Sequence, residues 1–120
     1  MEITLYDHKG DAISYIDEYG TIYLFNGKPV GYIEGDTVYS KVNHHLGWYE
    51  EGWVRDYRGR RVFYTKNATE SGPIPPVRNA SPLKDVKKFF KVKGNKYRKI
   101  VKSGKSSSWS AYSGDMFFYQ

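Results

Sequence analysis

The sequence of 120 residues contains no cysteine and no long apolar run, and each absence excludes a class of protein. Without cysteine the chain can form neither disulfides nor thiolate metal sites. No apolar stretch approaches the roughly 18 residues of a membrane-spanning helix, and Met1 leads directly into a strand-like segment instead of a signal peptide. We therefore expect a cytoplasmic protein with no membrane partner, and export without a signal peptide is the alternative.

Aliphatic residues are also scarce. Hydrophobic residues make up 39% of the chain, and aromatic residues alone make up 18%, with 12 tyrosines. A chain of this length is expected to form one domain over residues 1–120 and to bury about two-thirds of its unfolded surface. Much of the packing inside that domain must therefore be aromatic.

The net charge of +6 is divided unevenly along the chain. Residues 1–76 carry 8 basic and 11 acidic side chains, whereas residues 77–105 carry 11 basic side chains and one acidic side chain. The last fifteen residues carry only Asp115. The sequence thus predicts a mildly acidic folded body followed by a strongly basic tail.

One short sequence unit occurs four times in the first half of the chain. The copies occupy residues 10–17, 27–34, 43–50 and 59–66, and their first residues, the anchors, are 17, 16 and 16 positions apart. Asp7–Gly10 and Asp56–Gly59 have the Asp-x-x-Gly pattern of a type I turn. Asn26-Gly27 predicts a type I′ turn with positive φ at both residues, and at Asn43-His44 asparagine is expected to replace glycine.

Alternating apolar and polar residues between these turns predict eight short strands. One strand follows the Asn43-His44 turn, and the other seven are expected at Glu2–Asp7, Ala12–Asp17, Thr21–Phe25, Val30–Glu34, Thr37–Lys41, Trp53–Asp56 and Arg61–Thr65. A single hairpin of this size is marginally stable in water, so the units must pack together. We predict an all-β fold in which four β-hairpins stand around a pseudo-fourfold axis.

The four units carry side chains of the same kind at equivalent positions. Three residues after each anchor stands an aliphatic residue, and five residues after it stands a large aromatic residue: Ile13, Val30, Leu46 and Val62, then Tyr15, Tyr32, Trp48 and Tyr64. Positions two apart on a strand share a face, so we expect both sets to pack together against neighbouring hairpins. The residue between them is small in three copies and Phe63 in the fourth, which indicates close backbone approach on the opposite face.

Four stretches of the sequence are distinctive in combination. They are the Tyr-x-Phe-Asn-Gly turn ending at Gly27, Leu46-Gly-Trp-Tyr-Glu-Glu-Gly-Trp-Val-Arg-Asp56, Gly72-Pro-Ile-Pro-Pro76, and Ser108-Trp-Ser110 followed by Phe117-Phe118. Over nearly the whole chain they resemble the bacterial 4-fold beta-flower domain family. The resemblance implies a four-petalled β fold with a tail rich in proline and basic residues, and it brings no established activity or catalytic residue. This chain keeps the basic residues but loses most of the prolines after Pro82.

The tail is expected to be extended and to follow the body. Residues 67–82 read as a proline-containing loop, and a weaker repeat then occurs at 83–87, 92–96 and 101–105, each copy offset by nine residues. We interpret residues 67–105 as an extended chain that touches equivalent sites on successive hairpins of the body, residues 1–66. An added hairpin over Val86–Tyr97, turning at Gly94-Asn95, is the alternative.

The last segment, residues 106–120, is expected to dock onto the body. Its aromatic residues are too apolar for a free chain end, and burial of such a ring is worth roughly 1.5–3 kcal/mol. They are Trp109, Phe117, Phe118 and Tyr119.

Few residues are candidates for catalysis or metal binding. His8, His44 and His45 are interpreted as turn and rim residues, because a metal site needs three or four convergent groups. The acidic residues that end three return strands are explained by repetition and solvation, without a catalytic pair: Asp17, Glu34 and Glu50. Trp48 and Trp53 are interpreted as packing residues, with a sugar- or peptide-binding surface as the alternative. We expect no enzymatic activity, no cofactor and no metal.

The basic tail is the candidate binding surface. Its cations are interleaved with Phe89, Phe90 and Tyr97, and they are Lys87, Lys88, Lys91, Lys93, Lys96, Arg98 and Lys99. Cations beside stacking rings favour single-stranded nucleic acid, whereas in the interpretation that we prefer the rings pack on the hairpins and the lysines solvate strand edges. We therefore expect a non-enzymatic interaction or adaptor domain with a protein partner. Nucleic-acid binding through the tail is the alternative, and a small enzyme comes third.

Overall fold

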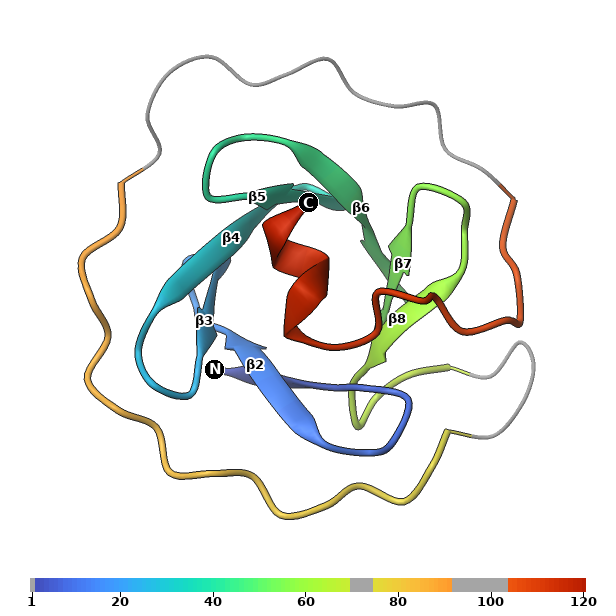
Figure 1. Ribbon diagram of the computed structural model, residues 1–120, viewed down its shortest axis with the longest axis horizontal. Coiled ribbons are helices and arrows are strands. Elements are labelled where there is room, and N and C mark those ends of the chain that lie inside the picture. Colours follow the sequence, from blue (N-terminus) through green and yellow to red (C-terminus); the bar gives the residue numbers. More distant parts are fainter. Residues whose placement is uncertain (1, 70–74, 92–103) are drawn as a thin grey trace.

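The computed structural model describes residues 2–69, 75–91 and 104–120, and in these residues the chain forms a closed all-β barrel. Its eight strands are β1 (Ile3–Tyr6), β2 (Ala12–Ile16), β3 (Thr21–Leu24), β4 (Pro29–Glu34), β5 (Thr37–Ser40), β6 (His45–Glu50), β7 (Trp53–Asp56) and β8 (Arg61–Tyr64). Each strand pairs antiparallel with the next, and β1 closes the ring onto β8 (Figure 1). The predicted all-β class and the four hairpins are confirmed. We call β1–β2, β3–β4, β5–β6 and β7–β8 petals 1 to 4.

The joint between β1 and β8 is the weakest of the barrel. It holds one residue pair, Tyr6 with Tyr64, whereas every other joint between these strands holds three or four. The two tyrosine rings stack with their centroids 5.5 Å apart. Ring packing therefore closes the barrel where backbone pairing is short.

All four petals turn in the same way. The N–H of the fourth turn residue donates to the carbonyl of the first over 2.9–3.0 Å in Asp7–Gly10, Leu24–Gly27, Ser40–Asn43 and Asp56–Gly59. The fourth residue has a positive φ, and Asn43, with φ 71°, replaces glycine as expected. The type I′ turn predicted for Asn26-Gly27 is wrong, because only Gly27 has a positive φ. Petal 2 instead uses the same four-residue turn as its neighbours.

A β-bulge recurs at one position in every petal. The register shifts between Leu5 and Tyr6, Ile22 and Tyr23, Val38 and Tyr39, and Val54 and Arg55. On the return strand the residue skipped by the pairing is in each case the predicted aliphatic residue: Ile13, Val30, Leu46 or Val62. A bulge adds a residue to one strand and breaks the alternation of faces. The expectation that this residue shares a face with the aromatic residue two positions later is therefore wrong.

The bulge separates two kinds of packing. The aliphatic residues form the central cluster with their counterparts on the outgoing strands: Leu5, Ile22, Val30, Val38, Leu46, Val54 and Val62 are buried, and Ile13 is partly buried against them. The aromatic residues lie outside this cluster and pack on other rings. Tyr15 stacks on Tyr23 with centroids 5.8 Å apart, and Tyr32 stacks on Tyr39 at 5.1 Å. The scarce aliphatic residues thus fill the centre, and the tyrosines surround it.

The small residues between these positions confirm the predicted close approach. A Cβ atom on Gly31 would collide with the carbonyl oxygen of Tyr39, and it would lie 3.7 Å from the ring of Phe118. In petal 4 the large Phe63 holds the equivalent position and stacks on Phe118 with centroids 5.5 Å apart. At this position petal 2 therefore leaves room for the end of the chain, and petal 4 supplies a ring to it.

The C-terminal segment ends in a short 3-10 helix, η1 (Asp115–Tyr119), which lies across the centre of the barrel (Figure 1). Phe117 and Phe118 are buried in the central cluster, and Trp109 packs against two aromatic rings of petal 4. Tyr119 is 52% exposed, and its ring lies 5.2 Å from Lys28 Nζ of petal 2, so it contacts the body without being buried. The core of the body is completed by residues far away in the sequence.

Candidate functional site

The basic tail forms a strap around the outside of the petals (Figure 1). We define the strap as residues 75–91 and 104–106. Its backbone N–H groups donate to the carbonyl oxygens of three anchors: Asn79 to Gly10 at 2.8 Å, Lys88 to Gly27 at 2.9 Å, and Ser106 to Gly59 at 3.0 Å. The donors are nine and eighteen residues apart. An extended chain that touches equivalent sites on petals 1, 2 and 4 is thereby confirmed.

Part of this prediction falls outside the described residues. The part of the tail that would reach Asn43, the anchor of petal 3, falls within residues 92–103, which are not among them. The alternative hairpin has its turn at Gly94-Asn95, which also lies outside them, and residues 86–91 contain no strand.

The strap lies so close to the anchors that only glycine fits beneath it. A Cβ atom on Gly10 would collide with the carbonyl of Val77, one on Gly27 with that of Val86, and one on Gly59 with that of Gly104. These carbonyls again follow the offset of nine. These three anchors are therefore glycine for two reasons, the positive φ of the turn and the contact with the strap.

The inward contacts of the strap recur every three residues. Every described strap side chain that contacts a petal ring falls on one row: Arg78 against Tyr6, Lys84 against Tyr15, Lys87 against Tyr15 and Tyr23, and Phe90 against Tyr32. Three residues per turn is the period of polyproline II, and nine residues of it span roughly 28 Å. That length is comparable with a quarter of the rim of a molecule measuring 37 by 36 Å. Nine residues make three turns of polyproline II, so the same side of the strap faces each successive petal.

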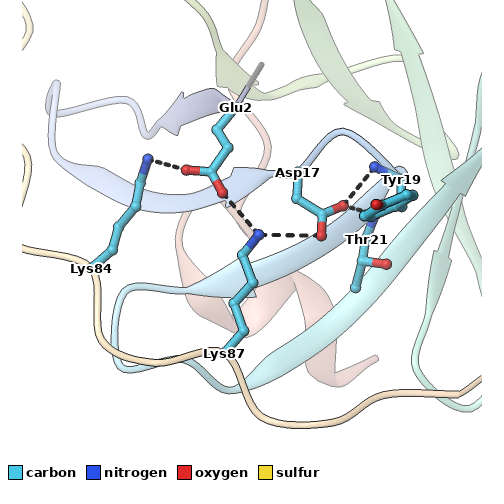
Figure 2. A network of polar contacts seen from close by, with 6 residues as sticks. All are labelled: Glu2, Asp17, Tyr19, Thr21, Lys84 and Lys87. Atoms are coloured by element: carbon cyan, nitrogen blue, oxygen red, sulfur yellow. Dashed lines mark hydrogen bonds and ion pairs between the residues drawn. The ribbon is translucent and has the colours of Figure 1, made fainter.

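An ion-pair network fastens the strap to petal 1 (Figure 2). Lys84 Nζ lies 2.7 Å from Glu2 Oε1, and Lys87 Nζ lies 2.9 Å from Glu2 Oε2 and 3.4 Å from Asp17 Oδ2. The other oxygen of Asp17 accepts two backbone N–H groups of the following turn, each at 3.0 Å. Asp17 is buried, so it does not belong to a solvated acidic column as expected. The acidic body and the basic tail are thus partners within one chain.

Charge pairing and burial shift the pKa values of this network away from neutrality. Hydrogen bonds from Lys84 and Lys87 lower the pKa of the Glu2 carboxyl below its ordinary value of 4.5. The hydrogen bond that Lys87 makes to Glu2 raises the pKa of Lys87. Burial raises the pKa of the hydroxyl of Tyr15, the ring that both lysines contact. Proton transfer at pH 7 favours groups whose pKa lies near 7. The network therefore holds fixed charges.

A buried arginine fixes the far end of the strap. Arg55 donates from one nitrogen to the carbonyl oxygens of Gly59 at 2.8 Å and Ser106 at 2.6 Å. Lys105 Nζ pairs with Glu51 Oε1 at 2.7 Å. The strap is therefore held at both of its described ends.

The strap also has an outer row, which contacts little of the body. This row consists of Val77, Ala80, Leu83, Val86 and Phe89, again at every third position. Val77, Leu83, Val86 and Phe89 are 83–95% exposed, more than any other large apolar side chain that the structure describes except Tyr19. Large exposed apolar patches on a protein surface often mark interaction sites.

The predicted nucleic-acid site is only partly described. Lys87 is taken up by the ion-pair network, and Lys88 and Lys91 are exposed without an ion-pair partner among the described residues. The other four lie outside the described residues: Lys93, Lys96, Arg98 and Lys99. The two phenylalanines divide between the two interpretations, because Phe90 packs on Tyr32 and Phe89 is 88% exposed.

The histidines do not converge on one site. His8 and His44 are exposed turn residues, as interpreted from the sequence, and both contact the C-terminal segment: the His8 N–H donates to Ser113 Oγ at 3.0 Å, and His44 Nδ1 lies 3.2 Å from the carbonyl oxygen of Gln120. His45 is buried, so the rim interpretation is wrong for it. In residues 2–69, 75–91 and 104–120 no three His, Cys, Asp or Glu side chains gather in a way that could hold a metal ion. The same residues contain no helix with the length and hydropathy needed to cross a membrane.

The outer row is the feature that sequence reasoning missed. Its signal is present in the sequence as apolar residues at 77, 80, 83, 86 and 89. This period of three is hard to recognise in the sequence, because lysines lie between the apolar residues and the longer repeat of nine overlaps it. A period of three matches neither a helix nor a strand, so it does not stand out as the pattern of a regular element.

Comparison with known proteins gives one match. The family model described as "4-fold beta flower protein" matches residues 3–118, which is nearly the whole chain. No curated protein and no solved structure matches the chain.

Proposed function

The chain belongs to the 4-fold beta flower family, and we propose that this member is a non-enzymatic interaction module whose partner protein binds the outer row of the strap. The observation that carries the proposal is the exposure of Leu83, Val86 and Phe89, which are 95%, 83% and 88% exposed on a backbone hydrogen-bonded to the body. The body serves as the scaffold that presents this edge. A cytoplasmic location stays a prediction.

The strap is a preorganised ligand. A free extended peptide loses backbone and side-chain entropy when it binds, and rigid presentation lowers that cost. Here the backbone of the strap is held before any partner arrives. It is held by the hydrogen bonds at Gly10, Gly27 and Gly59 and by the strap side chains that contact petal rings. Polyproline-type segments bind grooves lined with aromatic side chains, which accept residues at every third position. We therefore expect a partner groove with apolar pockets about 9 Å apart.

Charge adds a second feature to the expected partner. Lys88 and Lys91 flank Phe89, and both are exposed. An acidic rim on the groove would complement them and would speed association at low salt. The expected partner is thus a protein with an aromatic groove and an acidic border.

Single-stranded nucleic acid is the alternative ligand. The exposed ring of Phe89 between two lysines is the observation that favours it, because bases stack on such rings and phosphates pair with the cations. The two ligands differ in what they need from the strap. A groove needs Leu83 and Val86 as much as Phe89, whereas nucleic acid needs the ring and the lysines.

A photocrosslinking experiment in cells tests the proposal. A photoreactive amino acid at Val86 should capture one discrete protein, and the same amino acid at Val42 should not. Val42 is a matched control because it is apolar, 56% exposed and located in the turn of petal 3. Leu83→Ser should abolish the crosslink at Val86. Equal capture at both positions would contradict a specific outer row.

A binding assay separates the alternative. We expect no saturable change in fluorescence anisotropy when the full chain is titrated into labelled single-stranded DNA or RNA at about 50 mM salt. Binding that is lost in Phe89→Ser but unchanged in Leu83→Ser would identify nucleic acid as the ligand and contradict a protein groove.

A further inference from the structure

A second candidate site lies at the turn of petal 4, close to the described end of the strap at Ser106. A hollow of about 180 Å³ separates the turn of petal 4 from the C-terminal segment. Asp56, Arg58 and Arg60 line one side of it, and Ser110 and Tyr112 line the other. The hollow exists because the C-terminal segment returns to petal 4 before it enters the centre of the barrel.

Both walls of the hollow are fixed by hydrogen bonds. On one side Asp56 Oδ1 accepts the backbone N–H groups of Arg58 at 2.9 Å and Arg60 at 3.0 Å. On the other side Ser110 Oγ accepts the N–H of Tyr112 at 3.1 Å, which leaves the serine hydroxyl proton to donate elsewhere. The Ser110 N–H is itself bonded to the carbonyl of the neighbouring strand β8 at 2.6 Å. The backbone on both sides of the hollow is therefore held in place before a ligand enters.

The charge of this turn is not explained by the fourfold repeat. At the two positions that flank the anchor, petals 1, 2 and 3 carry Lys9 and Asp11, Asn26 and Lys28, and Val42 and His44. Petal 4 alone carries two cations there, Arg58 and Arg60. Four of the six arginines of the chain lie between positions 55 and 61. The positive charge is thus concentrated at one of four otherwise equivalent turns.

We propose that this hollow binds a phosphate monoester, with the guanidinium groups of Arg58 and Arg60 on the phosphoryl oxygens and the Ser110 hydroxyl as a further donor. Arginine presents a planar fork of N–H donors that matches two phosphate oxygens at once. The Arg58 guanidinium lies 5.6 Å from the ring of Tyr57, which limits the directions it can take. Two guanidinium groups exceed the single charge of Asp56, whose Oδ1 is already engaged by the turn. This site is independent of the outer row of the strap.

Tyr112 distinguishes between sources of the phosphate. Its side chain is 39% exposed at the mouth of the hollow, where a ring can stack on the base of a nucleotide. A volume of about 180 Å³ accommodates a phosphoryl group, and the arginines and the serine that line it are donors that suit phosphoryl oxygens. A nucleoside monophosphate would therefore place its phosphate inside and its base against Tyr112, whereas inorganic phosphate would use the inner donors alone.

A titration followed by ¹⁵N–¹H spectra of the full chain tests the site. Inorganic phosphate, and separately a nucleoside monophosphate, are added at constant ionic strength. We expect saturable shifts confined to Asp56–Arg60 and Ser110–Tyr112. Arg58→Gln combined with Arg60→Gln should weaken binding at least tenfold. Lys9→Gln, the equivalent change in petal 1, is the control and should leave the affinity unchanged. All three side chains are exposed, so these variants should fold.

Each outcome decides the proposal. Shifts that grow linearly with concentration, or that spread over surface lysines, would overturn it, as would equal affinity in the double arginine variant. Tighter binding of the nucleoside monophosphate than of phosphate, lost in Tyr112→Leu, would identify a nucleotide as the source. Equal affinity for both would assign the site to the phosphoryl group alone.

Discussion

The body and the strap are both periodic, but they are stabilised in different ways. The body repeats every 16 or 17 residues, and its strands pair along their length around a buried aliphatic cluster. The strap repeats every nine residues, and each described repeat is held by one or two backbone hydrogen bonds and a row of inward contacts. One strap repeat corresponds to one petal. We therefore expect that the strap can be released while the barrel stays folded.

The largest effect is expected at the centre of the body. Leu46→Asp should unfold the protein, because Leu46 is 2% exposed and a buried unpaired charge costs several kcal/mol against a total stability of about 5–15 kcal/mol. Val42→Asp, in the turn of the same petal and 56% exposed, should change stability little. Denaturant melts followed by circular dichroism measure both. A Leu46→Asp protein with the wild-type midpoint would disprove the central packing.

The next effect concerns the C-terminal helix. Phe117→Ala removes a fully buried ring from the central cluster and should cost about 3–5 kcal/mol. Met116→Ala is the matched control, since Met116 precedes it in η1 and is 62% exposed. The same melts should separate the two variants. Equal midpoints would place the C-terminal segment outside the cooperative fold.

A smaller effect is expected where the strap meets an anchor, and a pair of glycines isolates it. Gly27→Ala and Gly35→Ala both force a methyl group onto a positive φ, at about 1–2 kcal/mol. Gly35 has open space around its Cβ position, whereas a Cβ atom on Gly27 collides with the strap at Val86. Gly27→Ala should therefore also release the strap. Trypsin should cleave at Lys88 at least tenfold faster in that variant than in Gly35→Ala, and equal rates would show that the strap does not depend on the contact.

Much of the body could be predicted from sequence because its signals are local. The anchors of the turns and the alternation of the strands each depend on a few neighbouring residues, so the spacing of 17, 16 and 16 was enough to place four hairpins. The bulges were not predictable in this way. A bulge depends on the register between two strands. It turns Val30 and Leu46 inward, but the alternation of apolar and polar residues in the sequence is the same with or without it.

The candidate sites depend on contacts between distant residues. The Asn79 N–H donates to Gly10, although most of the body sequence separates the two residues. Ser110 and Arg58 line the same hollow only because the chain returns to petal 4 after the strap. No local pattern records such meetings. The sequence could show that the tail repeats and is basic, but it could not show which edge faces outward, because that requires the position of the petals.

The smallest predicted effect is the dependence of the strap on pH. Because Lys84 and Lys87 lower the pKa of Glu2 in the folded protein, its ion pairs stabilise the attached strap fully above pH 4.5, the ordinary carboxyl value. The stabilisation is lost as the pH falls from there through the lower folded pKa. Both partners are partly exposed, so the contribution should stay below about 1 kcal/mol.

Hydrogen exchange at the Lys88 amide measures this contribution, because its N–H donates to Gly27 only while the strap is attached. After correction for intrinsic exchange, protection at Lys88 should fall between pH 5 and pH 3, whereas protection within the strands should not. Glu2→Gln removes the carboxylate that pairs with both lysines, and it should leave Lys88 less protected at pH 5 and less sensitive to further acid. Parallel pH profiles for the two proteins would mean that the strap is held by its backbone contacts alone, and that the acidic body and the basic tail contribute nothing through Glu2.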